Sequence, residues 1–405
     1  MPERRVVITG IGVVSALGRN AGEFWQSLVD CRSGFGPIQS VDITGLRFSI
    51  GGEVHGYSAA DHFENKEADF LDRFAQFAVI AAREAVRDSA IDWTPDLRER
   101  SAIVTGSCVG GKSSEDEGFQ NIYLLKKPRV NPLTIPRSMA NAGASCISME
   151  TGITGPTYTI STACASSSHA IGQAFWLVRS GIVEAAITGG SEAPFSMGHL
   201  KAWEAMRVVS PDTCRPFSKN RRGMMLGEGG AMLVLETLEA AQARGAKIYG
   251  ELVGFGMSSD AHHLTQPSIE GPARAIRGAL RDGGLAPEQI GYINAHGTAT
   301  PANDPTEVSA IRMVFGPHAD RVPVSSTKSM HGHALGAAGA IEAVATVLAL
   351  RNGVLPPTAN YQEPDPQCDL DFIPNASRRV EVEYALSNSF AFGGLNAVLA
   401  FRAWR

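Results

Sequence analysis

The sequence has little of what marks a disulfide-stabilised, metal-binding or nucleic-acid-binding protein. Its 405 residues include only six cysteines, with neither a CxxC pair nor another spacing typical of metal ligands. Such sparse cysteines predict reduced thiols in a cytoplasmic protein that needs no metal and no other cofactor. The net charge is −5 and no block of like charges occurs. This argues against nucleic acid or an anionic membrane surface as the main partner.

Long hydrophobic runs are missing as well. The longest apolar helical stretch, Gly336 to Leu350, contains Glu342, and we expect it to be too short to span a bilayer. The N-terminal residues Met1 to Ile8 enter a strand at once and show no signal region or cleavage site. These absences predict a soluble protein without a membrane span. The hydrophobic content of 44% is enough to fill a large core.

The chain repeats itself. Four segments of the first half recur in the same order in the second half: 6–15 with 250–259, 82–88 with 276–282, 169–174 with 333–338, and 229–235 with 393–399. The order predicts two copies of one mixed β/α unit, a half over residues 1–248 and a half over residues 249–405. Aligning His169 with His333 places Lys328 opposite Cys164. Gly10 and Gly12 lack the third glycine of a dinucleotide site, so we expect them to allow close packing instead.

Predicted strands and helices alternate along the chain. Strands are expected near 102–105, 157–160, 185–189, 231–235, 292–295 and 322–325. Helices are expected near 22–30, 72–88, 165–180, 270–283, 304–314 and 338–351. The helices at 165–174 and 334–345 are rich in alanine and glycine, which indicates close packing between sheets. The fold class is therefore α/β, and a layered α/β/α/β/α arrangement fits the pattern.

Cys164 is the residue most suggestive of chemistry. It lies between the β-rich segment 157–160 and a helical pattern of small residues. Unpaired backbone N–H groups and the helix dipole at such a bend favour a thiolate and can hold an oxyanion. A free cysteine taken alone is more often a small buried hydrophobe. His296 and His333 favour a site, because each lies beside glycine after a predicted strand.

The other candidates have structural alternatives. We interpret His262, His263 and His331 as surface or core histidines. Lys328 is either a solvated lysine or, from its place opposite Cys164 in the repeat, part of a site. Glu342 lies in an apolar helix and needs a partner if it is buried.

These motifs resemble those of the β-ketoacyl-[acyl-carrier-protein] synthases, with ketoacyl synthase II the most similar branch. The motifs are residues 162–167, 294–300, 325–333 and 388–396, and the resemblance covers nearly the whole chain. It implies a duplicated thiolase-like fold and an acyltransferase of the EC 2.3.1 class. The reaction is a decarboxylative Claisen condensation of an acyl-enzyme thioester with malonyl-carrier protein, giving a 3-oxoacyl product. Segments 201–207 and 357–361 resemble the nodulation-type synthases of rhizobia.

The resemblance also implies a role for each candidate. Cys164 would take the acyl group, His296 and His333 would stabilise the enolate, and Lys328 would orient the region of His333. The backbone N–H groups of Cys164 and Phe392 would hold the oxyanion. The remaining implied residues are Phe392 and Gly393 for gating, Val109, Thr265, Thr298, Thr300 and Phe390 for substrate binding, and Asp304, Glu307 and Glu342 for support. Val109 stands at the position whose bulk limits the acyl pocket.

The implied partner is acyl carrier protein, loaded with acyl or malonyl groups, in fatty-acid, specialised lipid or polyketide synthesis. Residues 124–139 include Lys126, Lys127, Arg129 and Arg137, which form either a docking surface for this acidic partner or an ordinary solvated face. The family implies a homodimer with an acyl tunnel crossing its interface. A heterodimer with a chain-length partner stays open.

Three alternatives are weighed against this interpretation. A thiolase needs a second cysteine near the C-terminus followed by x-Gly, whereas Cys368 precedes Asp369 without that glycine. A ketoacyl synthase III would carry asparagine in place of His333. A non-catalytic chain-length factor would lack the nucleophilic Cys164. The sequence therefore favours an active synthase.

Overall fold

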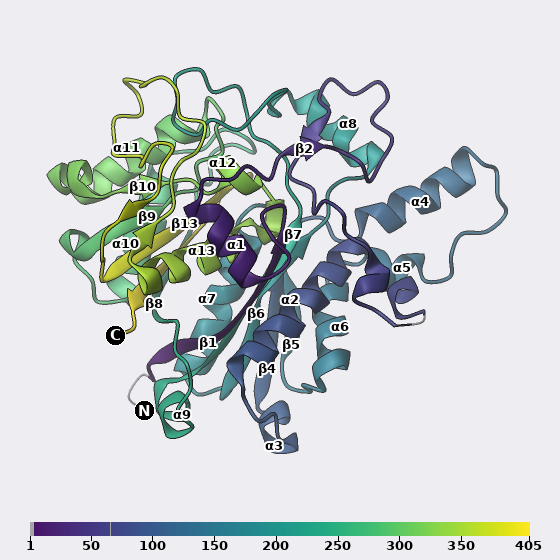
Figure 1. The fold of residues 1–405 in the computed structure, drawn as a ribbon, viewed down its shortest axis with the longest axis horizontal. Helices are drawn as coiled ribbons and strands as arrows, with labels where there is room; N and C mark the ends of the chain where they lie inside the picture. Colours follow the sequence, from purple (N-terminus) through teal and green to yellow (C-terminus); the bar gives the residue numbers. More distant parts are fainter. Residues whose placement is uncertain (1–3, 65) are drawn as a thin grey trace.

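The computed structural model describes residues 4–64 and 66–405, so the predicted N-terminal residues Met1 to Glu3 lie outside the described residues. Its main strands are β1 (Val6–Ser15), β4 (Ser101–Gly106), β5 (Thr157–Ile160), β6 (Ala185–Glu192), β7 (Gly229–Thr237), β8 (Gly250–Ser259), β9 (Ile290–Asn294), β10 (Val324–Ser325), β13 (Tyr384–Ala391) and β14 (Leu395–Ala403). They form one sheet in the order β10-β9-β13-β14-β8-β1-β7-β6-β4-β5 (Figure 1).

The sheet shows the duplication predicted from the sequence. From the centre outward, β1, β7, β6, β4 and β5 pair in the same parallel and antiparallel pattern as β8, β14, β13, β9 and β10. The two sets meet where β1 and β8 pair over only three residue pairs, from Val6 with Leu252 to Ile8 with Gly250. The boundary between residues 248 and 249 lies just before β8 and stays a prediction.

Helices surround and separate the two sets of strands. The helices α7 (Ser166–Arg179) and α13 (Ala338–Asn352) lie between them and contact strands of both. The outer face of the first set is covered by α2 (Arg73–Ser89) and α6 (Ala142–Thr151). The outer face of the second set is covered by α10 (Glu270–Asp282), with α11 (Asn303–Phe315) beside it. The predicted α/β/α/β/α layering is confirmed.

Glycines allow the outer helices to lie close to the sheet. A Cβ atom added to Gly12 of β1 would lie 2.0 Å from the carbonyl oxygen of Ala81 in α2. At the equivalent position of β8, a Cβ on Gly256 would lie 2.1 Å from the carbonyl oxygen of Ala275 in α10. Real Cβ atoms do not approach an oxygen so closely, so these positions accept only glycine. The predicted packing role of the Gly-x-Gly segments is confirmed.

The most apolar stretch of the chain is a core element. Residues Leu335–Asn352 are long and apolar enough to cross a membrane by length and composition alone, so the expectation that this region is too short was wrong. Within the described structure, however, 89% of the stretch is buried. Such all-round burial is typical of a central helix in a large soluble fold. The helix α13 is apolar because it lies in the core of the described structure.

The remaining helices belong to the segments that connect these layers. They are α1 (Ala21–Val29), α3 (Pro95–Glu99), α4 (Lys112–Tyr123), α5 (Thr134–Ser138), α8 (Met197–Met206), α9 (Leu238–Ala243) and α12 (Lys328–His331), the last of which is fully buried. Short strands are β2 (Gly36–Pro37), β3 (Ile50–Gly51), β11 (Val354–Leu355) and β12 (Arg378–Arg379). Together, α4, α5 and the loop between them form an arm, residues 112–139, that projects from the body at the right of Figure 1.

Candidate active site

Cys164 lies at the turn from β5 into α7, as the sequence predicts. Ala163 has a φ of +50°, and the backbone N–H groups of Ala165 and Ser166 donate to the carbonyl oxygens of Thr162 and Ala163. The hydroxyl of Ser166 accepts from the backbone N–H of Thr162 at 2.9 Å. These bonds close a tight turn that holds Cys164 directly before the first helical turn. The Cys164 residue is only 7% exposed.

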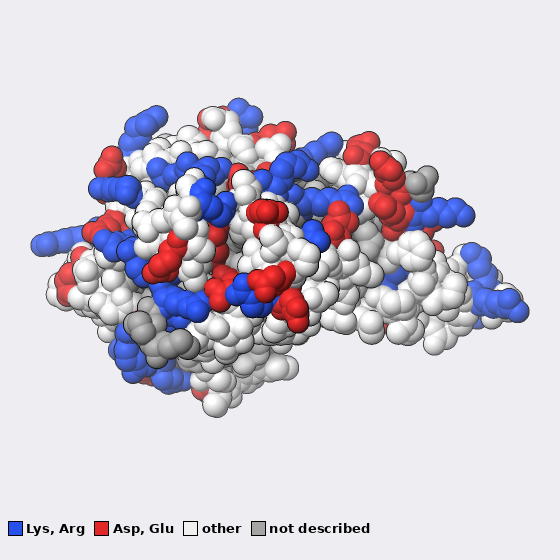
Figure 2. Space-filling model, turned by 90° about the horizontal axis from the view of Figure 1, so that it is seen from below, with Lys and Arg blue, Asp and Glu red and all other residues white. Residues whose placement is uncertain are grey.

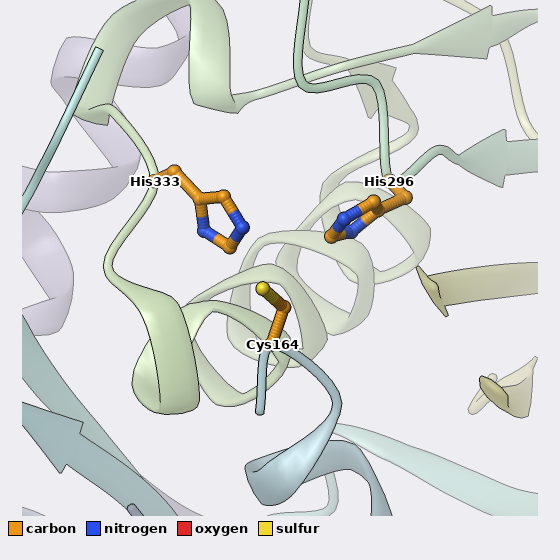
Figure 3. Close-up of side chains that lie close together, drawn as sticks. All are labelled: Cys164, His296 and His333. Carbon is orange, nitrogen blue, oxygen red and sulfur yellow. The ribbon is translucent and has the colours of Figure 1, made fainter. Parts of the chain in front are cut away.

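Two histidines from the second half of the chain flank this cysteine (Figure 3). His296 follows β9, and His333 follows α12. Their ring centroids lie 5.3 Å apart with an interplanar angle of 84°. One ligating atom from each of Cys164, His296 and His333 lies within 4.8 Å of the others. These three atoms are close enough together to bind a metal ion. The sequence spacing of the three residues gives no sign of this.

The three side chains line an open cavity of about 310 Å³. Five further predicted residues, Thr265, Thr298, Thr300, Phe390 and Phe392, line the same cavity. Val109 and Gly393 are not among the lining residues, although the neighbouring Gly394 is. The role of Val109 in limiting an acyl chain therefore stays a prediction.

Burial has the largest effect on the pKa of the Cys164 thiol. It raises the pKa of the Cys164 thiol to about 11. The positive charge of Lys328 and the backbone N–H groups of Phe392 and Cys164 act in the opposite direction. The backbone N–H groups thus favour the thiolate, as the sequence predicts, but desolvation outweighs them and the thiol pKa is raised overall. The two N–H groups nevertheless lie beside the sulfur, which places them near the carbonyl oxygen of an acyl group bound to it.

Both histidines are neutral at physiological pH. Burial lowers the pKa of His296 and of His333 well below the usual value, and the charge of Lys328 lowers both further. The Nδ1 atom of His333 accepts a hydrogen bond from the backbone N–H of Leu335 at 3.2 Å, which assigns the ring proton to Nε2. This Nε2 is buried and has no hydrogen-bond partner among the described residues. His333 therefore keeps one N–H donor free beside Cys164.

Lys328 acts from outside the cavity. Its ammonium group is fully buried and forms an ion pair with the Glu342 carboxylate. Glu342 is thus buried with a partner, which was the condition set by the sequence. Burial raises the pKa of Glu342 to about 7, although Lys328 opposes this shift. The Lys328 ammonium group of this pair lies close enough to both histidines to lower their pKa values.

Glu307 and Asp304 support the segment that carries His296, and the charge of Lys328 also opposes the rise that burial causes in the pKa of Glu307. Glu307 accepts hydrogen bonds from the backbone N–H groups of His296 and Gly297, both at 2.8 Å. Asp304 accepts from the backbone N–H groups of Phe217 and Ala299. These two buried carboxylates fix the backbone that precedes the predicted substrate-binding threonines.

Phe392 stands at a turn between β13 and β14. Gly393 and Gly394 have φ values of +82° and +69°, which glycine adopts without strain. The backbone N–H of Gly393 donates to the carbonyl oxygen of Leu264 at 2.7 Å. The Phe392 ring stacks on Trp203 of α8 at 6.2 Å between centroids. The turn thus holds Phe392 between the cavity and α8.

Sequence reasoning missed several residues of this region. Trp203 lines the cavity, but the apolar residues of α8 show no regular spacing that would indicate a site. His263 was interpreted as a surface or core histidine; it is exposed, and it also lines the mouth of the cavity. His331 is buried and shares a hydrogen bond with Thr327, as expected of a core histidine.

The sequence matches one family over most of its length. Residues 3–241 match the family described as "Beta-ketoacyl synthase, N-terminal domain", and residues 249–362 match its C-terminal domain. The chain is 47% identical over 404 residues to Nodulation protein E of a Rhizobium species, with 99% of both chains covered. It is 45% identical over 415 residues to 3-oxoacyl-[acyl-carrier-protein] synthase 2 of a Synechocystis species, covering 100% of this chain and 99% of that one.

A solved structure agrees with these relatives. The structure described as "The ishigamide ketosynthase/chain length factor" superposes with a TM-score of 0.95 at 38% identity, and all of both chains are covered. The chain belongs to the β-ketoacyl synthase family. It has the fold of the thiolase-like ketosynthases. Within the family it is a 3-oxoacyl-[acyl-carrier-protein] synthase, a condensing acyltransferase of fatty-acid or specialised lipid synthesis that resembles both synthase 2 and Nodulation protein E.

Proposed function

We propose that Cys164, His296 and His333 carry out the condensation, with Lys328 setting their charge states. The observation that carries the proposal is the convergence of these three side chains in one cavity. A cysteine nucleophile divides the reaction into acyl transfer and condensation, since the acyl group waits on sulfur between the two steps.

In the first step, the sulfur of Cys164 attacks the carbonyl carbon of an acyl thioester. The new C–S bond forms, the thiol of the carrier leaves with a proton, and an acyl-enzyme results. The N–H groups of Cys164 and Phe392 stabilise the negative oxygen of the tetrahedral intermediate, and they favour the sulfur anion that must form first.

In the second step, malonyl thioester loses CO₂ and leaves an enolate. The free Nε2–H of His333 donates to the enolate oxygen, and neutral His296 does so from the other side. The enolate carbon then attacks the acyl carbonyl, and Cys164 leaves as a thiolate that regains its proton. The product is a 3-oxoacyl thioester two carbons longer than the acyl group.

Acyl carrier protein is the proposed donor of both substrates, and the enzyme is proposed to act in the cytoplasm. In Figure 2, basic side chains gather at the tip of the arm, at the right of the view. Lys126, Lys127 and Arg129 lie in the exposed loop between α4 and α5. Their positive charge supports the docking of an acidic carrier protein there.

A homodimer is the proposed assembly. The arm exposes apolar side chains, among them Tyr123, Leu124 and Ile135 at 66%, 73% and 70%. At its base, α5 contacts α6, which packs on the edge strand β5. Exposed apolar patches and free strand edges are typical of interfaces. One similar structure is described as a ketosynthase/chain length factor, so a heterodimer is the alternative.

Intact-mass measurement tests the nucleophile. The wild type is incubated with acyl carrier protein thioesters of graded chain length, beside Cys164→Ala and the matched variant Cys31→Ala. We expect an acyl adduct on the wild type and on Cys31→Ala, and none on Cys164→Ala. Absence of any adduct on the wild type at every length would refute the proposal and favour a cavity-shaping subunit.

A further inference from the structure

A buried carboxylate without a cation stands behind the nucleophile. Glu192 is the last residue of β6, its exposure is 0%, and no ion pair joins it to any described residue. Four donors surround it instead. Oε1 accepts from the Ser107 hydroxyl at 3.0 Å and from the Val109 backbone N–H at 3.3 Å. Oε2 accepts from the backbone N–H groups of Cys108 at 2.6 Å and Gly336 at 3.1 Å.

These donors belong to different halves of the chain. Ser107, Cys108 and Val109 directly follow β4, whereas Gly336 lies three residues beyond His333. The contact is tight, since a Cβ added to Gly336 would lie 2.3 Å from the backbone nitrogen of Cys108. The oxygen Oε2 therefore bridges the loop 107–109 and the segment that carries His333.

The loop 107–109 also adjoins the nucleophile. A Cβ on Gly106, the residue before the loop, would lie 2.3 Å from the backbone nitrogen of Ser167 in the first turn of α7. The Cys108 thiol is close enough to Cys164 for the charge of one to raise the pKa of the other. The loop thus packs beside the Cys164 turn.

We propose that Glu192 is a positioning residue that sets the loop 107–109 against the His333 segment and thereby determines which acyl chains the enzyme accepts. The proposal rests on the proposed function and on the role that the family resemblance implies for Val109, whose bulk would limit the acyl chain held by Cys164. Burying a carboxylate is costly, and the four donors offset only part of this cost, since burial still raises the pKa of Glu192 to about 7. Its negative charge works against the Cys164 thiolate, so its benefit lies in geometry rather than in activating the nucleophile.

Two variants separate the bridge from the charge. In Glu192→Gln the amide N–H₂ can face the Ser107 hydroxyl, which accepts as readily as it donates, so the remaining oxygen still serves Cys108 and Gly336. Only the longest of the four bonds, from the Val109 N–H at 3.3 Å, loses its acceptor. In Glu192→Ala both bridge and charge are lost. Glu236→Ala is the matched control, because Glu236 is equally buried but bonds to Thr9 and Arg244 on β1 and the edge of α9.

The first measurement is the ratio of kcat/KM for long and short acyl carriers, which does not depend on the folded fraction. We expect Glu192→Ala to change this ratio at least fivefold, and Glu192→Gln and Glu236→Ala to change it less than twofold. An unchanged ratio in Glu192→Ala overturns the proposal. An equal change in Glu192→Gln also overturns it, because the charge and not the bridge would then be responsible.

The second measurement is amide hydrogen exchange of the peptides that contain 107–109 and 336. It needs no activity, so the bridge is tested even if wild-type Cys164 takes no acyl group and the proposed function fails. We expect exchange at least tenfold faster in Glu192→Ala at both peptides, and wild-type rates there in Glu192→Gln and Glu236→Ala. Wild-type exchange in Glu192→Ala means that Glu192 does not hold the two segments together.

Discussion

At the scale of single residues, the charge of Lys328 reaches all three side chains that converge in the site. It lowers the pKa of His296, of His333 and of Cys164 without lining the cavity itself. For the histidines the effect adds to that of burial, so both stay neutral donors. For the cysteine it opposes burial and brings the thiolate closer. In the proposed mechanism, one buried cation therefore favours both half-reactions.

Replacing Lys328 by methionine should damage stability and shift the pH dependence. Glu342 would be buried without its cation, at a cost of about 3–5 kcal/mol in the free energy of unfolding. Burial already raises the pKa of Glu342, so the loss should grow as pH rises from the ordinary carboxyl range to neutrality, where the folded state must bury the charge. Urea denaturation at several pH values measures this.

A double variant separates stability from catalysis. Lys328→Met with Glu342→Gln removes both buried charges, and we expect stability within about 1 kcal/mol of the wild type. The pKa of His296 and of His333 should rise once the positive charge is gone, because it no longer opposes their protonation. The acid limb of the decarboxylation rate should therefore move to higher pH. An unshifted limb in a stable double variant would contradict this account of Lys328.

His333→Ala tests the division of labour within the site. It removes the donor for the enolate but leaves the sulfur and its two N–H groups in place. We expect malonyl decarboxylation to fall by about 10²–10³-fold, the usual effect of losing one preorganised donor, while Cys164 is still acylated. Release of CO₂ and intact mass measure the two steps, with His318→Ala as a distant control. Equal loss of both steps would show that His333 also serves acyl transfer.

At the scale of elements, the glycines of β1 and β8 set how closely α2 and α10 approach the sheet. Gly12→Ala and Gly256→Ala place a methyl group against a helix carbonyl, so each should destabilise the protein by about 1–3 kcal/mol or more. Gly22→Ala in α1 would meet only the Asn20 side chain, at 3.3 Å, and should be close to neutral. Urea midpoints compare the three, and a harmless Gly12→Ala would disprove the packing role.

Helices with a clear spacing of apolar residues could be predicted from the sequence, and helices without such a spacing could not. The amphipathic α2 and α10 and the apolar α13 lie within two residues of their predicted bounds. In contrast, α4, α5 and α8 bury few residues, so no apolar stripe marks them. The convergence of Cys164, His296 and His333 followed from family motifs. Trp203 and Glu192 were missed because their importance lies in contacts between distant segments, which no local pattern records.

At the scale of the whole molecule, the arm should decide the oligomeric state. Leu124→Glu with Leu125→Glu puts two charges on its exposed apolar surface, and burying them in an interface would be costly. By light scattering after size exclusion, we expect the double variant to be a monomer and the wild type to be a dimer. Ile182→Glu, equally exposed but at the far end of α7, is the control and should stay dimeric. A monomeric wild type would refute the proposed homodimer.

The short pairing of β1 with β8, the strands at which the two sets meet, bears on how the protein is synthesised. All five strands of the first set are complete by Thr237, before any residue of β8 leaves the ribosome. The nascent chain therefore contains its thiol long before it contains either imidazole. In the proposed mechanism, a polypeptide released early from translation would therefore carry the nucleophile without the two histidines that support the loss of CO₂ from malonyl groups.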